Sequence, residues 1–402
     1  MFYLDRFVRF GYAELKVRPI GHSLILFAEQ LSFLFMTLNK IENAFFELLR
    51  IALGTQEKMT VALNDAEWKD VAQMAVKQSV LGILFTAVET LPEEQRPYND
   101  LYIDMYKWVD TIEQRNEHMN KLTASVSNRF RKDGFPNCIL KGQGVALLYP
   151  KPLRRHSGDV DVWLKGKRKD IIKYIRKIPG ADRPGYVHMG FKLNKKDVIE
   201  VHFTPSYMFN PFKNPNMQRW FESQQDAQIN NYTPIPNTEY KIPTPTTSFN
   251  VIYSLNHIFR HFFNGGIGVR HIIDYFYILN AYYSEHHTEQ EKAELLKVIE
   301  QFNMTKFLTA LSWILANLLG QEREKLLVEP NEDEGRFFLQ EVFVSGNFGK
   351  SDPQQQKNNG KKNLYSFFNN QARIMRFFTR YPEEVCWRPI TSIKNQIVEH
   401  TS

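Results

Sequence analysis

The chain has 402 residues, of which 43% are hydrophobic and 24% are charged, and its formal net charge is +7. This length allows two or three domains with a sizeable core, and the composition excludes global disorder, collagen and coiled coil. The two cysteines, Cys138 and Cys386, exclude a disulfide framework and a cysteine-based metal cluster, which favours a reducing compartment and predicts a cytoplasmic protein.

Residues 1–35 show poor periodicity and no helix-capping pattern. The most apolar stretch, 23–38, is interrupted by Glu29 and Gln30 and is shorter than the ~20 apolar residues that a membrane span requires. No membrane span is therefore expected. We interpret residues 1–35 as a leader that contributes little to the fold. The alternative is an amphipathic arm that lies on a membrane surface.

Residues 36–134 are expected to form a helical region. Apolar residues recur at helical spacing over 42–53. A second helix is expected over 64–78, where Asn64 and Asp65 are candidates for the N-terminal cap and Glu67 lies three residues after Asn64. A long periodic segment over 101–131 is followed by Asp-Gly, which is typical of a helix end. Nothing in this region points to a particular chemistry.

Residues 135–205 are expected to form a compact α/β core. Apolar and polar residues alternate strictly over 159–164, and the short turn between 188–194 and 198–203 predicts a hairpin. The expected elements in chain order are a strand over 138–141, a glycine turn with a short helix, a strand over 159–164, a helix over 167–178 and strands over 188–194 and 198–203. The predicted fold class is therefore α+β, with a small mixed β-sheet core flanked by N-terminal and C-terminal helical regions.

Beyond this core, residues 206–247 form a Pro/Asn-rich connection with one polar helix expected near 217–229. Helical spacing then returns and predicts a C-terminal helical domain over 248–402. Within that domain, the polar low-complexity stretch 351–362 is expected to be a linker or loop. A last helix near 364–379 is expected to end before a Tyr-Pro pair.

Positive charge concentrates in one part of the chain. Residues 151–196 hold fourteen Lys and Arg against four Asp, while the rest of the chain is nearly neutral. A basic block in a nearly neutral protein favours a local site for a polyanion over a surface that coats nucleic acid. The equal alternative is that much of this block is a solvated helix face.

The strongest functional signal is the pair Asp159 and Asp161. Because side chains alternate along a strand, both carboxylates project from the same face, where a divalent cation would relieve their repulsion. Mg²⁺ prefers carboxylate oxygens together with substrate phosphates. Glu200 and His202 share the polar face of a later strand, so Glu200 supplies the third acid that a two-metal transfer site requires. On its own, the aspartate pair would fit two solvated side chains equally well.

The turn Gly142-Gln143-Gly144 connects the first strand of the core to a helix start, upstream of the two aspartates. Backbone N–H groups at a helix start can hold a phosphate. Lys141 or Arg155 would neutralise the charge of that phosphate. The alternative is that the glycines only let the strand turn into the helix.

The stretch 140–164 resembles the signature of a family of bacterial nucleotidyltransferases in the DNA polymerase β-like superfamily. The positions that match this signature are Lys141, Gly142, Tyr149, Pro150, Arg155, Gly158, Asp159 and Asp161. The resemblance continues at Glu200 and His202. It extends to a later Gly-x-Arg-x-x-x-Asp pattern, which singles out Arg270 and Asp274.

This resemblance implies transfer of a nucleoside monophosphate from an NTP, with Mg²⁺, or alternatively Mn²⁺, in a two-metal site. It implies that Asp159, Asp161 and Glu200 are the catalytic and metal-binding residues. The implied nucleotide-binding residues are Lys141, Gly142, Gln143, Arg155, Ser157 and Gly158, and the accessory ones are His202, Arg270 and Asp274. The acceptor could be a sugar phosphate, a protein, a small metabolite or RNA, and the sequence specifies neither the acceptor nor the oligomeric state.

Two other functions remain open at this point. In a nucleotide-sugar glycosyltransferase, the two aspartates would hold Mn²⁺, but that fold places several strands before them, where this chain predicts helices. A non-catalytic nucleotide-binding scaffold would keep the sheet without turnover. His257 and His261 are spaced i,i+4 and could hold a metal, but without a third ligand at suitable spacing they are expected to be interior histidines. Arg270 and Asp274 are expected to form an i,i+4 pair, either as a structural ion pair or in contact with the nucleotide.

Overall fold

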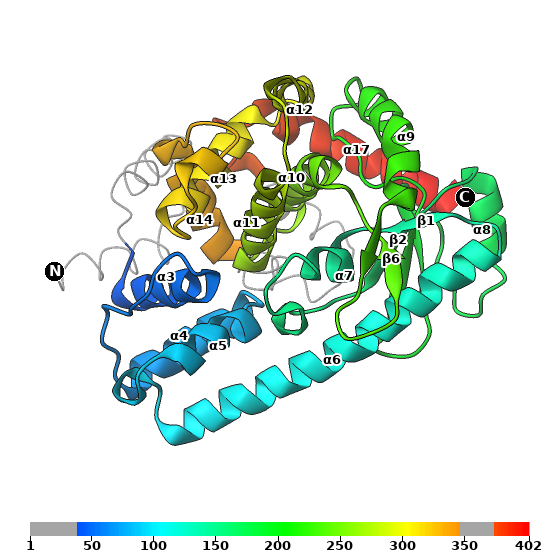
Figure 1. Ribbon diagram of the computed structural model, residues 1–402. Helices are drawn as coiled ribbons and strands as arrows, with labels where there is room; N and C mark the ends of the chain where they lie inside the picture. The colour runs from blue at the N-terminus through cyan, green and yellow to red at the C-terminus, as the bar shows by residue number, and fades with distance from the viewer. Residues whose placement is uncertain (1–37, 346–373, 402) are drawn as a thin grey trace, which may run out of the picture. The chain divides into compact units, whose positions relative to one another are not determined.

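The computed structural model describes residues 38–345 and 374–401. The described residues from Lys40 onward belong to one compact unit. Its fold is mixed α+β, as predicted, with a small sheet among many helices (Figure 1). The expected leader over 1–35 and the expected linker over 351–362 lie outside the described residues.

Four of the described helices precede the sheet: α3 (Lys40–Leu53), α4 (Asp65–Lys77), α5 (Leu81–Thr90) and α6 (Asn99–Lys132). The start of α4 follows from its sequence, because Asn64 Oδ1 accepts the backbone N–H of Glu67 at 3.0 Å and Glu67 accepts that of Asn64 at 2.9 Å. The sequence pattern does not predict α5 as a separate helix. This helix is buried around most of its circumference and so lacks the amphipathic pattern that reveals a surface helix.

The sheet has four strands in the order β1-β2-β4-β3, with the bounds β1 (Asn137–Ile139), β2 (Val160–Leu164), β3 (His188–Lys192) and β4 (Val198–His202). β2 and β4 run parallel, whereas β1 and β3 are antiparallel to their neighbours, so the sheet is mixed. The predicted hairpin is the β3–β4 pair. Within the described residues, β1 alone precedes β2, which differs from the several strands expected for a glycosyltransferase.

One face of the sheet packs against α6 and α8 (Arg168–Ile175). Val160 and Val162 of β2 belong to this core, together with Phe130 of α6 and Ile171 of α8. All four side chains are at least 98% buried. The alternation along β2 therefore directs Val160 and Val162 into this core and Asp161 to the opposite face.

The opposite face meets α9 (Asn214–Asn230) and α10 (Thr247–Asn264). Here Trp163 of β2 stacks on Phe249 of α10, with ring centroids 5.8 Å apart and planes inclined by 15°. Phe221 of α9 meets the same Trp163 ring edge-on at 6.5 Å. These aromatic contacts fix α10 against the strand that carries the aspartates.

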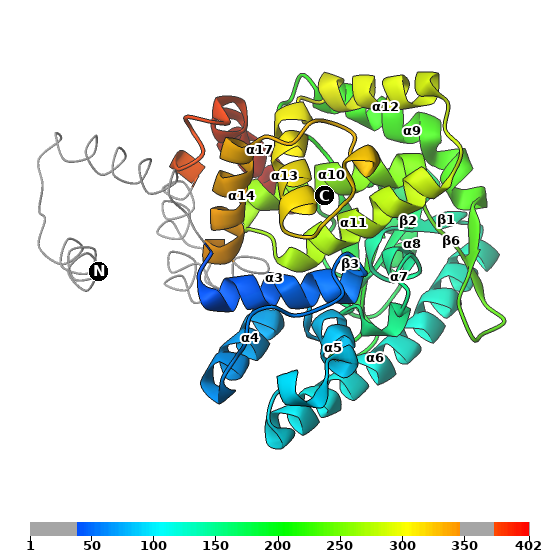
Figure 2. The same cartoon turned by 60° about the vertical axis from the view of Figure 1, so that its left-hand side comes forward.

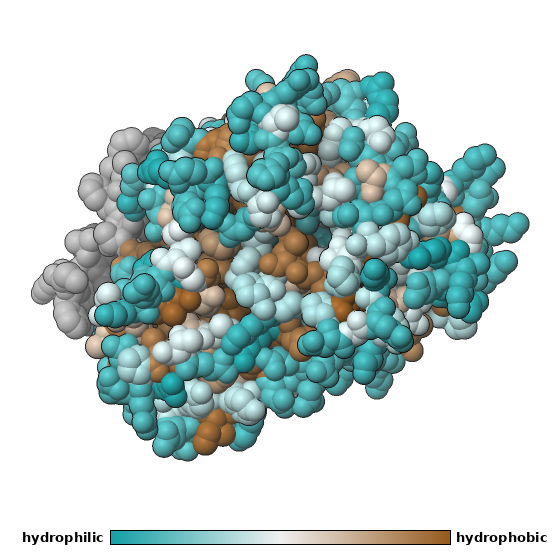
Figure 3. Space-filling view, in the orientation of Figure 1, coloured by the Kyte–Doolittle hydropathy of each residue, from teal (hydrophilic) through white to brown (hydrophobic). Residues whose placement is uncertain are grey.

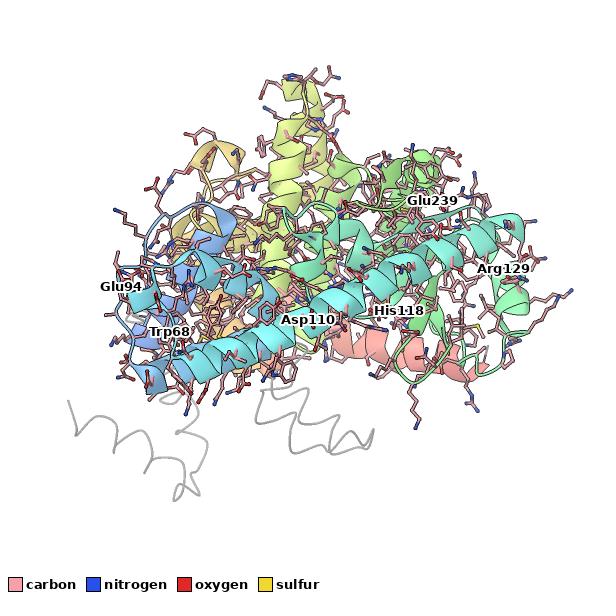
Figure 4. All side chains as sticks on the ribbon, turned by 60° about the horizontal axis from the view of Figure 1, so that its bottom comes forward. Trp68, Glu94, Asp110, His118, Arg129 and Glu239 are labelled. Carbon is pink, nitrogen blue, oxygen red and sulfur yellow. The ribbon has the colours of Figure 1, made fainter. Side chains whose placement is uncertain are left out.

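Helix α6 spans 34 residues and also holds the β3–β4 hairpin. Figure 4 shows it running along one face, with Asp110, His118 and Arg129 along its length. Arg115 Nη1 and His118 Nε2 lie 2.5 and 2.9 Å from the carboxylate of Asp197, in the hairpin turn. Burial opposes the charge on Asp197, but hydrogen bonds from Arg115 and His118 lower its pKa to about 2. The turn that precedes β4 is therefore fastened to α6.

The connection between the sheet and α10 contains a two-stranded sheet that the sequence analysis does not predict, formed by β5 (Tyr232–Pro234) and β6 (Lys241–Pro243). Proline is disfavoured in strands because it has no N–H to donate to a neighbouring strand. In this sheet each strand has only one neighbour, and proline is tolerated in such edge strands. Ile235 and Ile242 are buried in the same core as β2. The expected polar helix near 217–229 is α9.

The C-terminal region is helical, as predicted, and its described helices are α10, α11 (Val269–Ser284), α12 (Glu289–Gln301), α13 (Thr305–Asn317), α14 (Glu332–Ser345) and α17 (Pro382–Thr401). Helices α13 and α14 pack against each other (Figure 2). Of the last helix predicted near 364–379, only 374–379 lies in the described residues, and α17 follows it, so it is not the last helix. There, 374–380 is mostly turn and α17 begins at Pro382, because proline is well suited to the first position of a helix.

The surface in Figure 3 is mostly hydrophilic around its edge, and hydrophobic side chains gather toward its middle. Among the described residues, no helix combines the length and the apolar character that crossing a membrane requires.

Candidate active site

The three acids singled out in the sequence lie together in the structure. Asp159 directly precedes β2, Asp161 lies on β2, and Glu200 lies opposite Asp161 on the parallel strand β4. One carboxylate oxygen from each lies within 4.8 Å of those of the other two. The cluster forms because the pleat of two adjacent strands directs alternate side chains to the same face.

Asp161 is the most buried of the three acids, with 3% exposure. Its Oδ1 atom lies 2.8 Å from Lys141 Nζ and 2.9 Å from His202 Nε2. Burial opposes the charge on Asp161, but Lys141 and the hydrogen bond from His202 outweigh burial and hold its pKa below its ordinary value. Asp161 is therefore an ionised carboxylate whose charge is balanced by neighbouring groups.

Asp159 is in the opposite electrostatic situation. Repulsion from Asp161, and then burial, raise the pKa of Asp159 to about 6. At Glu200, burial also opposes the charge, but the nearby imidazole of His202 holds its pKa below the ordinary value. The outer part of the cluster thus carries negative charge that a bound cation would neutralise.

This donor set fits a hard divalent cation. Mg²⁺ binds carboxylate oxygens and keeps positions for water or substrate phosphates, and Mn²⁺ accepts the same ligands. Asp159, Asp161 and Glu200 provide three such carboxylates from two rigid strands. All three line one pocket.

The predicted glycine turn lies at the start of α7 (Lys141–Ala146), which follows β1, and its residue Gly142 departs from helical geometry. Gly142 has a φ of 44°, which favours glycine, and a Cβ at this position would lie 3.3 Å from the carbonyl oxygen of Asp159. A Cβ on Gly144 would lie 2.9 Å from the carbonyl oxygen of Ile139 in β1. A side chain at Gly142 or Gly144 would disturb these two close backbone contacts. The same turn places Lys141 beside Asp161.

Arg155 is buried and fully engaged by an acid from a distant helix. Its Nε and Nη2 atoms donate to the two carboxylate oxygens of Asp274 on α11, at 2.7 and 2.8 Å. The hydroxyl of Tyr149 donates to the same carboxylate at 2.6 Å. Burial opposes the charge on Arg155, but Asp274 raises its pKa above its ordinary value. This network fastens the segment that precedes β2 to α11.

The expected i,i+4 ion pair between Arg270 and Asp274 is replaced by the pair between Arg155 and Asp274. Arg270 instead donates through Nη1 to the carbonyl oxygen of His156 at 3.0 Å. Burial and the nearby Arg155 lower the pKa of Arg270 to about 10. The i,i+4 spacing predicts that Asp274 pairs with Arg270 on the same helix. In the tertiary structure, Arg155 binds Asp274 through two hydrogen bonds instead, and helical spacing cannot predict that partner.

The sheet and the helices α10 and α11 enclose a pocket of about 230 Å³. On the helix side, the pocket is lined by His257, Arg260, His261, Arg270 and His271, among others. Burial holds the pKa of His257 and of His261 well below the ordinary value, so both are neutral near pH 7. The two histidines line the pocket as interior residues, and neither belongs to a group of potential metal ligands among the described residues.

Arg260 is a candidate functional residue that the sequence analysis misses. It lines the same pocket as the acids. Its guanidinium lies 4.8 Å from the ring centroid of Tyr207, and its buried Nε has no hydrogen-bond partner among the described residues. Its spacing of three residues from His257 places both on one helix face, but nothing in the sequence marks that face as the wall of a pocket.

Four of the six nucleotide-binding residues implied by the sequence line the pocket: Lys141, Gly142, Arg155 and Gly158. All three accessory residues, His202, Arg270 and Asp274, also line it. Gln143 and Ser157 do not contribute to this lining. Gln143 Nε2 instead donates to Asn120 Oδ1 of α6 at 2.6 Å, which braces the glycine turn from the side away from the pocket.

Comparison with known proteins gives one strong match. The model of a family described as uncharacterised nucleotidyltransferases matches residues 64–320, which includes the three acids and the helix wall of the pocket. No curated protein matches the chain. Among solved structures, an antigenic nucleotidyltransferase-like protein from Paracoccidioides brasiliensis is 13% identical, with 50% of this chain and 92% of that chain covered. Its TM-score is 0.28, too low for the likeness to support any argument.

Proposed function

The chain belongs to this family of uncharacterised nucleotidyltransferases, and we propose that it transfers a nucleoside monophosphate from an NTP to a hydroxyl or phosphate oxygen of an acceptor. The observation that carries this proposal is the cluster of Asp159, Asp161 and Glu200 in one pocket. Three carboxylates on adjacent strands, beside basic residues, suit a site that binds a divalent cation together with a polyanion. The acceptor is a sugar phosphate, a protein, a small metabolite or RNA, and the proposed compartment is the cytoplasm.

Asp159, Asp161 and Glu200 would hold the cations, with Mg²⁺ as the natural choice and Mn²⁺ as the alternative. Bound there, divalent cations would neutralise phosphate charge and polarise the attacking and leaving oxygens. Lys141 and His202 orient Asp161, since both contact its Oδ1 atom. The contribution of the chain is a rigid set of carboxylates that does not need to rearrange when the substrate binds.

The triphosphate would lie between the acids and the basic residues of the same pocket. Lys141 and Arg270 present positive charge there, and Gly142 and Gly158 allow close approach to the backbone. Arg260 is the best placed additional contact, because its buried Nε has no protein acceptor among the described residues. The proposed role of Arg155 in phosphate binding is indirect, because Asp274 already occupies its guanidinium.

The transfer itself is a displacement at the α-phosphorus. The acceptor oxygen forms a bond to this phosphorus, the bond from phosphorus to the oxygen that bridges to the β-phosphate breaks, and pyrophosphate leaves with that oxygen. Glu200 is the proposed acceptor of the proton from the attacking hydroxyl, because its low pKa keeps it ionised. Asp159 and Asp161 do not change protonation state in this scheme.

The test is incubation of the purified full chain with each α-labelled NTP, MgCl₂ and cell extract, followed by identification of the labelled product. Asp161→Asn and Glu200→Gln should lower the labelling rate by a factor on the order of 10³, as loss of a preorganised charged group does. Asp170→Asn, an exposed acid on α8, is the matched control and should label like wild type. If both active-site variants label as fast as wild type, the proposed function fails. NTP binding without any labelling would indicate a nucleotide-binding scaffold instead.

A further inference from the structure

Glu200 faces two histidines in addition to the two aspartates. His188 on β3 is paired in register with His202 on β4, and Glu200 lies two residues before His202 on the same strand face. One ligand atom from each of these three side chains lies within 4.8 Å of those of the other two. All three side chains line the pocket. Glu200 therefore belongs to two groups of potential ligands, one made of carboxylates alone and one with two imidazoles.

The distances within the second group suit a shared cation. Oε2 of Glu200 lies 3.6 Å from His188 Nδ1 and 3.7 Å from His202 Nε2. Both distances exceed the ~2.7–3.2 Å of an N–H···O hydrogen bond. Around a tetrahedral zinc ion, ligand atoms at bond lengths of ~2.1 Å lie about 3.4 Å from one another. Glu200 is thus spaced from both histidines like a fellow metal ligand rather than like a hydrogen-bonded partner.

The chemistry of this group differs from that of the three acids. Two imidazole nitrogens and one carboxylate oxygen are a donor set of zinc and of other first-row transition metals. Mg²⁺, in contrast, prefers oxygen ligands only. Three protein ligands also leave coordination positions open for water or a substrate group. Two neighbouring sites with different metal preferences would then share Glu200.

A cation can reach this group from solvent. The side chains of His188 and Glu200 are 43% and 25% exposed, whereas His202 is 2% exposed and anchors the group from the interior. His202 Nε2 also lies 2.9 Å from Asp161 Oδ1. A bound cation replaces the hydrogen that these two atoms share, and that proton leaves to solvent because a metal-ligating imidazole nitrogen must be deprotonated.

We infer that His188, Glu200 and His202 form a binding site for a transition-metal ion such as Zn²⁺, adjacent to the cation site of the three acids. The inference goes beyond the proposed function and is tested by metal binding alone. The labelling assay can therefore reject the proposed nucleotidyl transfer without rejecting this metal site. Metal titration can likewise reject the metal site without rejecting nucleotidyl transfer.

The main experiment is calorimetric titration of the chelator-treated full chain with ZnCl₂ and, separately, with MgCl₂. His188→Ala should weaken Zn²⁺ binding by about 100-fold or more, since even outer-shell changes at metal sites cost about 10–100-fold. The same variant should bind Mg²⁺ like wild type, because the three acids remain. The matched control is His286→Ala, which removes an exposed histidine between α11 and α12 and should bind Zn²⁺ like wild type.

Wild-type protein titrated with Co²⁺ gives a second measurement that does not depend on how the variants fold. We expect a visible absorption band typical of mixed nitrogen and oxygen ligands, displaced by Zn²⁺ but not by Mg²⁺. The site is excluded if no such band appears, or if His188→Ala binds Zn²⁺ as tightly as wild type. It is also excluded if Asp159→Asn abolishes Zn²⁺ binding while His188→Ala does not, because Zn²⁺ would then occupy the cluster of acids.

Discussion

The pocket has two walls of different origin. The sheet wall carries Asp159, directly before β2, with Asp161 on β2 and Glu200 on β4. The helix wall carries Arg260 on α10 and Arg270 on α11. On the sheet wall, the candidate site residues are visible in the sequence as a local pattern of alternating residues. On the helix wall, the functional candidates look like ordinary helix residues. Arg260 and Arg270 become candidates only because the structure shows that their helix faces line the pocket.

The two walls also differ in how their charges are balanced. Asp161 is balanced by Lys141 and His202, which lie next to it on the sheet side. On the helix side, Asp274 is balanced by Arg155, which comes from the segment that precedes β2. The Arg155–Asp274 pair therefore joins the two walls. This comparison predicts that substitutions at the junction affect folding, while those on the walls affect ligands.

The largest expected effect is at the junction. Arg155→Ala should destabilise the ligand-free protein by about 3–5 kcal/mol, because it leaves the buried Asp274 without its partner. Lys151→Ala, which removes a half-exposed partner of Glu89, should cost less than about 1 kcal/mol. The measurement is urea unfolding without metal or nucleotide. An Arg155→Ala protein that keeps full stability but loses affinity for NTP would show that Arg155 contacts the nucleotide directly.

A smaller effect is expected on the helix wall. Arg260→Met should weaken NTP binding by roughly 10–150-fold, equivalent to the ~1.5–3 kcal/mol of a charge-assisted hydrogen bond. Its stability should change little, since Arg260 forms no ion pair among the described residues. Arg219→Met, on the exposed side of α9, is the matched control. Equilibrium dialysis with labelled NTP gives both affinities, and equal affinities for the two variants would remove Arg260 from the site.

The smallest effect separates the two aspartates of the sheet wall. The pKa of Asp159 is about 6, against an ordinary 3.8. Ionisation of Asp159 is therefore less favourable in the folded protein than in the unfolded chain, and the free energy of unfolding falls as the pH rises from about 4 to 6. In metal-free protein at pH 8, Asp159→Asn should therefore be more stable than wild type by about 1–3 kcal/mol. Asp161→Asn should be less stable, because it leaves Lys141 and His202 without their shared acid.

Thermal unfolding in chelator at pH 8 and pH 5 checks this prediction. The advantage of Asp159→Asn should shrink at pH 5, where Asp159 is mostly protonated in the folded protein. Equal stabilities for the two variants at pH 8 would mean that the aspartates are electrostatically equivalent. The sequence alone treats them as equivalent, because both belong to the same strand pattern.

Where the sequence predicts well, the signal is local. The capping box at Asn64, the long period that becomes α6, and the alternation through Asp159 and Asp161 each depend on neighbours a few residues away. Glu200 follows by the same reasoning, because its strand carries its own alternation. The local pattern fails for α5, whose buried sequence has no polar face, and at Pro382, where the same proline that ends one helix can begin another.

By itself, the sequence determined the acidic sheet wall, because strand alternation fixes which side chains share a face before any tertiary contact is made. Only the tertiary structure decided that Asp274 pairs with Arg155, that Arg260 lines the pocket, and that His188 lies beside Glu200. These contacts join segments far apart in the chain. Their geometry depends on how helices and strands pack, and no short-range pattern in the sequence encodes it.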